Sequence, residues 1–133
     1  MAKAKRIKQL NFMMTDRVGR LSEVTAALAA AKVNIDNICP YGMEGEATFM
    51  LTTAGVAKAK KALSKIGAEV KEYDVVSVDL PNRPGELHKV ARKLADAGIN
   101  VMYMYGTSGQ ARTGTCIFVT SDNAQAVRLI NRK

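Results

Sequence analysis

The stretch Asn82–Leu87 carries the groups in this chain best suited to bind a small charged molecule. Alternating apolar residues before it predict a strand that stops at Pro81, and helical spacing begins at Leu87. Pro84 suits the first turn of a helix, and Gly85 lacks a Cβ, so another group can approach the backbone there. Because the first N–H groups of a helix have no intrahelical partner, this turn is predicted to attract a carboxylate or a phosphate.

The same turn occurs earlier in the chain, at residues 16–21. The identities extend through the following helix to the next strand: Arg17, Gly19, Leu21, Val24, Leu28, Ala29, Ala31 and Asn34 align with Arg83, Gly85, Leu87, Val90, Leu94, Ala95, Ala97 and Asn100. Far fewer matches are expected by chance, so the chain is a duplicated unit.

The elements that position the two turns follow one order. In the first unit we predict strands at 6–15, 33–39, 47–52 and 68–73 and helices at 21–31 and 56–66. In the second we predict strands at 75–80, 99–106 and 113–120 and helices at 85–97 and 124–131. The first unit is therefore βαββαβ, and the second lacks its last strand.

The division between the units is expected at residue 73, giving units 1–73 and 74–133, with residues 1–5 as a loose basic tail. No Gly or Pro interrupts residues 68–80, so the units are not joined by a flexible linker.

A free amino acid has both charges that such a turn could hold. The N–H groups of Gly85 and Glu86 are predicted to hold its carboxylate, with help from the helix dipole. Its ammonium needs acceptors, which Asn100, or Asp36 and Asn37 of the other unit, could provide. Nearby apolar side chains, Leu87, Met102 and Ile35, would then select the ligand's side chain.

Simpler roles for the same residues stay open. Both turn glycines could serve turn geometry alone, and Arg17 and Arg83 could tether the turns. Asn34 and Asn100 could make only local hydrogen bonds. His88, the single histidine, is expected to be a bystander.

With these residues in view, the chain resembles the ACT domain family. The resemblance rests on D-R-x-G-x-L at 16–21, N-I-D-N-I at 34–38, N-R-P-G-x-L at 82–87 and N-V at 100–101. It implies an α+β fold of two ferredoxin-like units, antiparallel sheets with helices on one face. It also implies an amino acid held at the interface between ACT units and sensed by a partner enzyme.

The resemblance and the physical argument together give one set of candidate ligand-binding residues. They are Asn82, Arg83, Pro84, Gly85, Glu86, Leu87, Asn100, Val101, Met102, Asp16, Gly19, Arg20, Leu21, Asn34, Ile35, Asp36 and Asn37.

Catalysis finds little support in the sequence. We assign no Ser/His/Asp or Cys/His set, since His88 is the only histidine. No P-loop, dinucleotide fingerprint or metal-ligand cluster occurs. We therefore expect no catalytic residues, no metal and no cofactor. Cys39 and Cys116 are expected to be buried free thiols. Without a membrane span or a secretion signal, the expected location is the cytoplasm.

The net charge of +8 leaves a nucleic-acid-binding alternative open. It would need exposed aromatic residues on the central strands, for which Tyr103, Tyr105, Phe118, Phe12 and Phe49 are the candidates. The spread of the lysines along the chain argues against this alternative. A structural subunit without a ligand is the third reading.

Residues 101–105 and 116–119 are apolar on both strand faces, which predicts a homodimer covering the open face of the sheet. The alternative is that tyrosine and methionine line a partly hydrated face.

Overall fold

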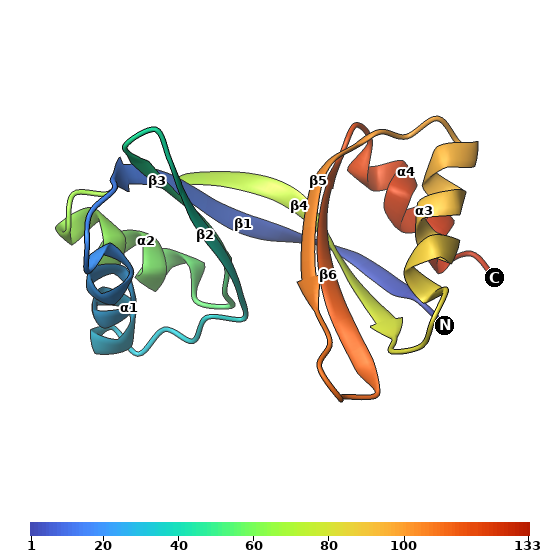
Figure 1. The fold of residues 1–133 in the computed structure, drawn as a ribbon, viewed down its shortest axis with the longest axis horizontal. Helices are drawn as coiled ribbons and strands as arrows, with labels where there is room; N and C mark the ends of the chain where they lie inside the picture. Colours follow the sequence, from blue (N-terminus) through green and yellow to red (C-terminus); the bar gives the residue numbers. More distant parts are fainter. The chain divides into compact units, whose positions relative to one another are not determined.

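The computed structural model describes all 133 residues. Its elements are β1 (Lys3–Thr15), α1 (Arg20–Ala30), β2 (Asn37–Met43), β3 (Glu46–Thr52), α2 (Val56–Lys65), β4 (Lys71–Pro81), α3 (Glu86–Asp96), β5 (Val101–Thr107), β6 (Thr113–Thr120) and α4 (Asn123–Asn131) (Figure 1). The hydrogen-bonded strand order is β2-β3-β1-β4-β6-β5. The α+β class and the ferredoxin-like pattern predicted from the sequence are confirmed.

The chain forms two compact units, one of which consists of two separate segments of the sequence. The first repeat's unit comprises Lys8–Tyr73, and the other comprises Met1–Ile7 together with Asp74–Lys133. The predicted units, 1–73 and 74–133, therefore differ from this division at residues 1–7. The loose tail predicted for residues 1–5 is also wrong, because β1 begins at Lys3. The apolar residues that alternate with the lysines here are the alanines Ala2 and Ala4, and alanine is a weak strand former, so the pattern gave little strand signal.

The unit Lys8–Tyr73 has its apolar core between the helices and the sheet. Leu10 and Phe12 of β1 and Phe49 and Leu51 of β3 form the sheet side of this core. The rings of Phe12 and Phe49 stack with their centroids 5.0 Å apart, as the cross-strand pairing of the two residues requires. Helices α1 and α2 cover this face with Val24, Leu28, Ala59, Ala62 and Leu63.

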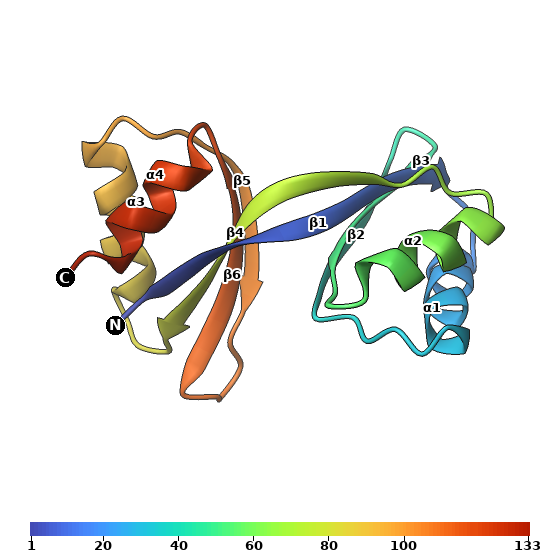
Figure 2. The ribbon, with the colours of Figure 1, turned by 180° about the vertical axis from the view of Figure 1, so that it is seen from behind.

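The second unit completes its sheet with the beginning of the chain. Its strands β4, β6 and β5 pair antiparallel, and β1 is the neighbour of β4 on the other side. The segment Met1–Ile7 thus occupies the edge that the missing last strand would have filled. Figure 2 shows the start of β1 along β4, near the end of α4. Ala4 belongs to the same buried cluster as Val78, Phe118 and Ile130.

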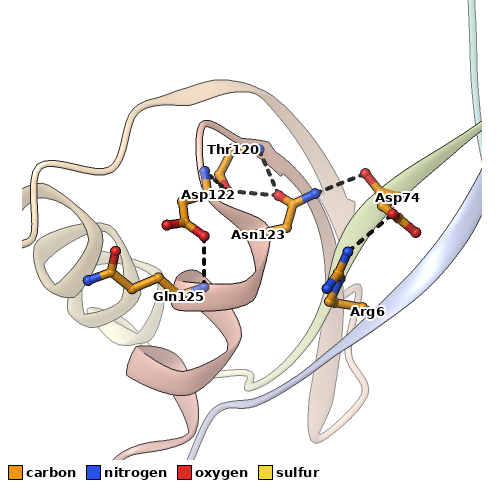
Figure 3. A network of polar contacts seen from close by, with 6 residues as sticks. All are labelled: Arg6, Asp74, Thr120, Asp122, Asn123 and Gln125. Atoms are coloured by element: carbon orange, nitrogen blue, oxygen red, sulfur yellow. Dashed lines mark hydrogen bonds and ion pairs between the residues drawn. The ribbon is translucent and has the colours of Figure 1, made fainter.

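A polar network joins this N-terminal segment to β4 and to the start of α4 (Figure 3). Arg6 Nη2 lies 3.1 Å from Asp74 Oδ2, and Asn123 Nδ2 donates to the Asp74 carbonyl at 2.9 Å. Asn123 Oδ1 accepts from Thr120, and Asp122 caps α4 by accepting from the Gln125 N–H at 3.0 Å. The strand that completes the second unit is therefore held by polar contacts as well as by the core.

Candidate functional site

Gly85 is the N-cap of α3 and has a left-handed backbone, φ 86° and ψ −9°. An L residue pays a steric cost in this conformation, so the turn favours glycine there. No side chain caps the helix start. A Cβ built on Gly85 would have no atom within 4 Å, so the space beside the backbone is open. The Glu86 N–H, predicted to hold a ligand carboxylate, already donates to the Arg83 carbonyl at 3.3 Å. The N–H groups that follow it in the first turn are the ones suited to an anion.

Glu86 is the ionic centre of this turn. Its Oε1 lies 3.0 Å from Arg83 Nη2 and 3.3 Å from Lys89 Nζ, and only 9% of its side chain is exposed. Burial opposes ionisation of this carboxyl. The hydrogen bond from Lys89 and the charges of Lys89 and Arg83 outweigh that effect, so the pKa of Glu86 lies below its usual value. Arg83 stays 67% exposed, which leaves guanidinium N–H groups for another anion.

Asn82 fastens the turn to the loop between β5 and β6. Its Nδ2 donates to the carbonyls of Gly109 at 3.0 Å and Ala111 at 2.8 Å, and its backbone N–H donates to the Arg112 carbonyl at 2.8 Å. Both amide hydrogens are therefore used within the protein. The oxygen Oδ1 is the polar atom of this side chain left to accept a hydrogen bond.

A pocket of about 240 Å³ opens beside the turn, within the second unit. One wall is the end of β4 and the start of α3, and the opposite wall comes from β5 and β6. Its apolar surface and its few polar groups are typical of a small-molecule site. The lining residues are Leu80, Pro81, Asn82, Arg83, Glu86, Leu87, Met104, Gly106, Thr107, Ser108, Gly114 and Cys116.

Cys116 of β6 lies opposite Gly106 of β5. A Cβ built on Gly106 would lie 2.6 Å from Cys116 Sγ, so only glycine fits opposite this thiol. Burial raises the pKa of the Cys116 thiol above its usual 9.0. Cys116 is therefore a protonated, weakly polar part of the pocket wall at neutral pH.

The corresponding turn of the first unit has the same backbone conformation, but its carboxylate and its arginines are arranged differently. Gly19 has φ 87° and ψ 0°, again without a side-chain cap. Here Glu23 is the acceptor, bonded to Arg17 and to Arg20, whose Nη1 is 3.0 Å from Glu23 Oε2. The hydrogen bond from Arg17 is the main reason that the pKa of Glu23 is lowered. Both arginines of the repeat, Arg17 and Arg83, thus make the ion pairs of a tether.

The space beside this first turn holds a carboxylate of the protein itself. Asp16 lies against β2, since a Cβ on Gly42 would be 2.6 Å from Asp16 Oδ2. The equivalent residue of the second unit is Asn82, which is neutral and turned to the loop. The two turns therefore differ in the charge that they offer to a ligand.

The predicted residues at the second strand of each unit lie apart from the turns. Asn100 donates its N–H to Ser121 Oγ at 3.0 Å, Val101 packs on the apolar core, and Met102 is 55% exposed. None of these three lines the pocket beside Asn82–Leu87. The reason is that the helix spans the unit between the turn and the next strand, so β5 begins at the opposite end from the turn.

In the first unit the corresponding residues make mainly local contacts. Asn34 Nδ2 donates to Asp36 Oδ1 at 3.2 Å, and Asn37 Nδ2 donates to Thr52 Oγ1 at 2.8 Å. Ile35 packs against the core. Their predicted role in ligand binding stays a prediction.

The sequence reading missed the far wall of the pocket. Met104, Thr107, Ser108, Gly114 and Cys116 come from the end of β5 and the start of β6. The repeat could not reveal them, because the aligned identities end at Asn100. The topology could have indicated these residues. The two strands of a βαβ unit are parallel, so the end of the second strand lies at the same edge of the sheet as the turn that follows the first strand.

Other kinds of site find no structural support. Phe12, Phe49 and Phe118 are at most 3% exposed, so three of the five aromatic candidates for nucleic-acid stacking lie in the cores. No group of three or more His, Cys, Asp or Glu side chains is placed to hold a metal ion. None of the helices is long and apolar enough to cross a membrane.

Comparison with known proteins finds a family match for the second unit. Residues 75–132 match the ACT domain. The matched range is the second unit without its N-terminal segment Met1–Ile7. The first unit shares the repeated turn and the corresponding strand order, β2-β3-β1-β4. No curated protein matches the chain.

Solved structures match the chain over nearly its whole length. Protein BT0572 from Bacteroides thetaiotaomicron is 28% identical, with a TM-score of 0.87, covering 95% of this chain and 87% of that one. The ligand-free regulatory subunit of aspartate kinase from Thermus thermophilus is 19% identical, with a TM-score of 0.68 and coverage of 96% and 93%. The corresponding subunit from Thermus flavus is 20% identical, with a TM-score of 0.63 and coverage of 96% and 94%. The two kinase subunits show a shared fold.

Proposed function

We propose that this protein is a regulatory subunit that binds a free amino acid in the pocket beside Asn82–Leu87 and transmits its occupancy to a partner enzyme. The observation that carries the proposal is a mostly apolar pocket that Glu86 and Leu87, in the uncapped first turn of α3, help to line. The fold shared with two regulatory subunits of aspartate kinase supports the regulatory part. As a non-catalytic subunit, it would act only through that partner.

Each part of an amino acid has a counterpart in this pocket. The first N–H groups of α3 and the exposed guanidinium of Arg83 suit its carboxylate. Asn82 Oδ1 and the hydroxyl groups of Thr107 and Ser108 suit its ammonium.

The ligand's side chain would contact the apolar wall. Leu80, Leu87, Met104 and the protonated thiol of Cys116 form this wall. Because these groups cannot satisfy a charge, we propose an apolar or weakly polar amino acid as the ligand. The carboxylate at the pocket edge, Glu86, is already paired with Arg83 and Lys89 and so offers little to a charged ligand side chain.

The first turn is proposed as the weaker site. Asp16 would offer a carboxylate to a ligand's ammonium, but it would repel a ligand carboxylate. The proposal retains Gly19, Arg20 and Leu21 as the rest of this site. It also retains a homodimer, since Tyr41, Met43 and Met102 expose large apolar surfaces.

Calorimetry against the twenty amino acids tests the proposal, with a pair of matched variants. Leu87→Lys places a charge in the pocket wall, and Leu21→Lys makes the same change at the equivalent position of the first turn. Both leucines are about half exposed, 43% and 51%, so both variants should fold. We expect millimolar or tighter binding that Leu87→Lys weakens at least about tenfold, which is roughly 1.4 kcal/mol. If none of the twenty amino acids binds, the proposal is contradicted. It is also contradicted if the Leu87→Lys protein binds the ligand as tightly as the wild-type protein does.

A further inference from the structure

A second hollow of about 380 Å³ lies on the other side of the Arg83–Glu86 pair, also within the second unit. We name it the basic groove, and define it by Arg83, Lys89, Lys93, Arg132 and Lys133, with Glu86 as its single carboxylate among the side chains. Met1 and Ala2 contribute apolar surface. Five cations thus surround one internal anion, which leaves an excess of positive charge in this groove.

Specific contacts hold these cations together. Lys93 Nζ donates to the carbonyls of Ile130 at 3.3 Å and Arg132 at 2.6 Å, so it fixes the end of α4 against α3. This contact brings Arg132 and Lys133 to the face of α3 that carries Lys89. Lys89 keeps 70% of its side chain exposed, and residues 132 and 133 are exposed as well. The fold therefore gathers like charges without a matching set of carboxylates.

Arg83 and Glu86 line both the pocket and the basic groove. They form the wall between the two hollows. An anion in the pocket and an anion in the groove would both interact with the positive charge of the Arg83 guanidinium. Their occupancies must then oppose each other, because one cation cannot fully serve two separate anions.

We propose that the basic groove docks an acidic segment of the partner protein, and that amino acid bound in the pocket weakens this docking through Arg83. This proposal rests on the proposed function for its regulatory meaning. Charge complementarity favours an acidic peptide. Apolar surface beside the cations suits a peptide, which carries apolar side chains next to its carboxylates. No aromatic residue lines the groove, so it lacks the stacking surface of a single-stranded nucleic-acid site.

Fluorescence anisotropy with a labelled peptide of alternating Glu and Leu residues tests the docking. The groove variant is Arg132→Ser with Lys133→Ser. The control variant is Lys58→Ser with Lys61→Ser, which removes the same charge from exposed positions of α2. We expect the groove variant to weaken binding at least about fivefold more than the control. Equal losses in both variants would mean a general charge effect and would overturn the proposal, as would tighter binding of an RNA oligonucleotide of equal charge.

The coupling is measured by repeating the titration with saturating amino acid, identified first by calorimetry. We expect peptide affinity to fall about fivefold or more, and Arg83→Gln to remove this difference. An affinity that the bound amino acid leaves unchanged would overturn the coupling. If no amino acid binds, the proposed function fails instead, while the comparison of the groove and control variants still decides the docking.

Discussion

Ala4 and Asn131, 127 positions apart, bond to each other through two hydrogen bonds. The Ala4 N–H donates to Asn131 Oδ1 at 2.7 Å, and Asn131 Nδ2 donates to the Ala4 carbonyl at 2.9 Å. The amide of the C-terminal helix therefore satisfies one backbone donor and one acceptor of the first strand. This pair ties the beginning of the chain to the unit that contains the candidate pocket.

Replacement of Asn131 by Ala should destabilise the protein by about 1–3 kcal/mol. The reason is that Ala4, only 9% exposed, would keep a backbone N–H and carbonyl without their side-chain partner. Chemical denaturation measures the free energy of unfolding. Arg128→Ala, at an exposed position of the same helix, is the control and should change it by less than about 0.5 kcal/mol. Equal losses in the two variants would show that the Ala4–Asn131 pair contributes nothing of its own.

Deletion of residues 1–7 should unfold the second unit preferentially. The deletion removes an edge strand, the buried Ala4 and the Arg6–Asp74 ion pair from that unit. We expect amide resonances of residues 74–133 to lose dispersion in NMR spectra while more of those from 8–73 persist. A matched deletion of residues 132–133, beyond α4, should leave both sets in place. Native spectra for the chain that begins at Lys8 would contradict the assignment of Met1–Ile7 to the second unit.

The stability of the protein should fall in acid partly because of Glu86. Its pKa is lower in the folded protein than the usual 4.5, so its ionised form stabilises the folded state above pH 4.5. That contribution disappears as the pH falls from 4.5 through the lower folded-state pKa. Glu86→Gln should therefore reduce the melting temperature at pH 7 and matter progressively less below pH 4.5.

The control for this prediction is Glu69→Gln, which removes an exposed carboxylate of the first unit. Thermal melts from pH 3 to pH 7 compare the three proteins. A difference between wild type and Glu86→Gln that stays constant across this range would exclude Glu86 as a source of the pH dependence. Glu23, whose pKa is also lowered, should contribute to the same acid loss in the other unit.

The Cys116 thiol should react slowly with alkylating agents, and more slowly when ligand is bound. Burial raises its pKa above 9.0, so little reactive thiolate is present at neutral pH. A Cys39→Ser background isolates this thiol, and mass spectrometry follows its reaction with iodoacetamide. The rate should increase as the pH rises past 9.0, and a bound amino acid should reduce it several-fold. Protection of Cys39 instead, in a Cys116→Ser background, would place the ligand away from this pocket.

The sequence predicted the parts of this protein that local pattern determines. Helical spacing from Leu21 and from Leu87 marked α1 and α3, and the glycines before them marked the two left-handed turns. These features depend on residues that are close in the sequence. Because the pattern is repeated, they could be predicted in both units.

The features that depend on residues far apart in the sequence could not be predicted. Ala4 is buried only because it faces the core of a unit whose other strands begin at residue 71. Two alanines alternating with lysines, Ala2 and Ala4, give only a weak strand signal, because alanine is depleted in strands. The pocket wall at Met104 and Cys116 depends in the same way on how β5 and β6 return to the turn. Asn100 was predicted to accept a hydrogen bond from the ammonium of a ligand held at this turn, although the helix places it at the other end of the unit.

The most direct test of the central claim is a ¹⁵N NMR titration of the whole protein with the amino acid that calorimetry selects. We predict that the largest saturable amide shifts fall on residues 82–87, 104–108 and 114–116, which form the pocket. The Leu87→Lys protein should show these shifts only at concentrations about tenfold higher. Saturable shifts confined to the first unit, or no saturable shifts with any amino acid, would contradict the claim that the pocket beside Asn82–Leu87 is the ligand site.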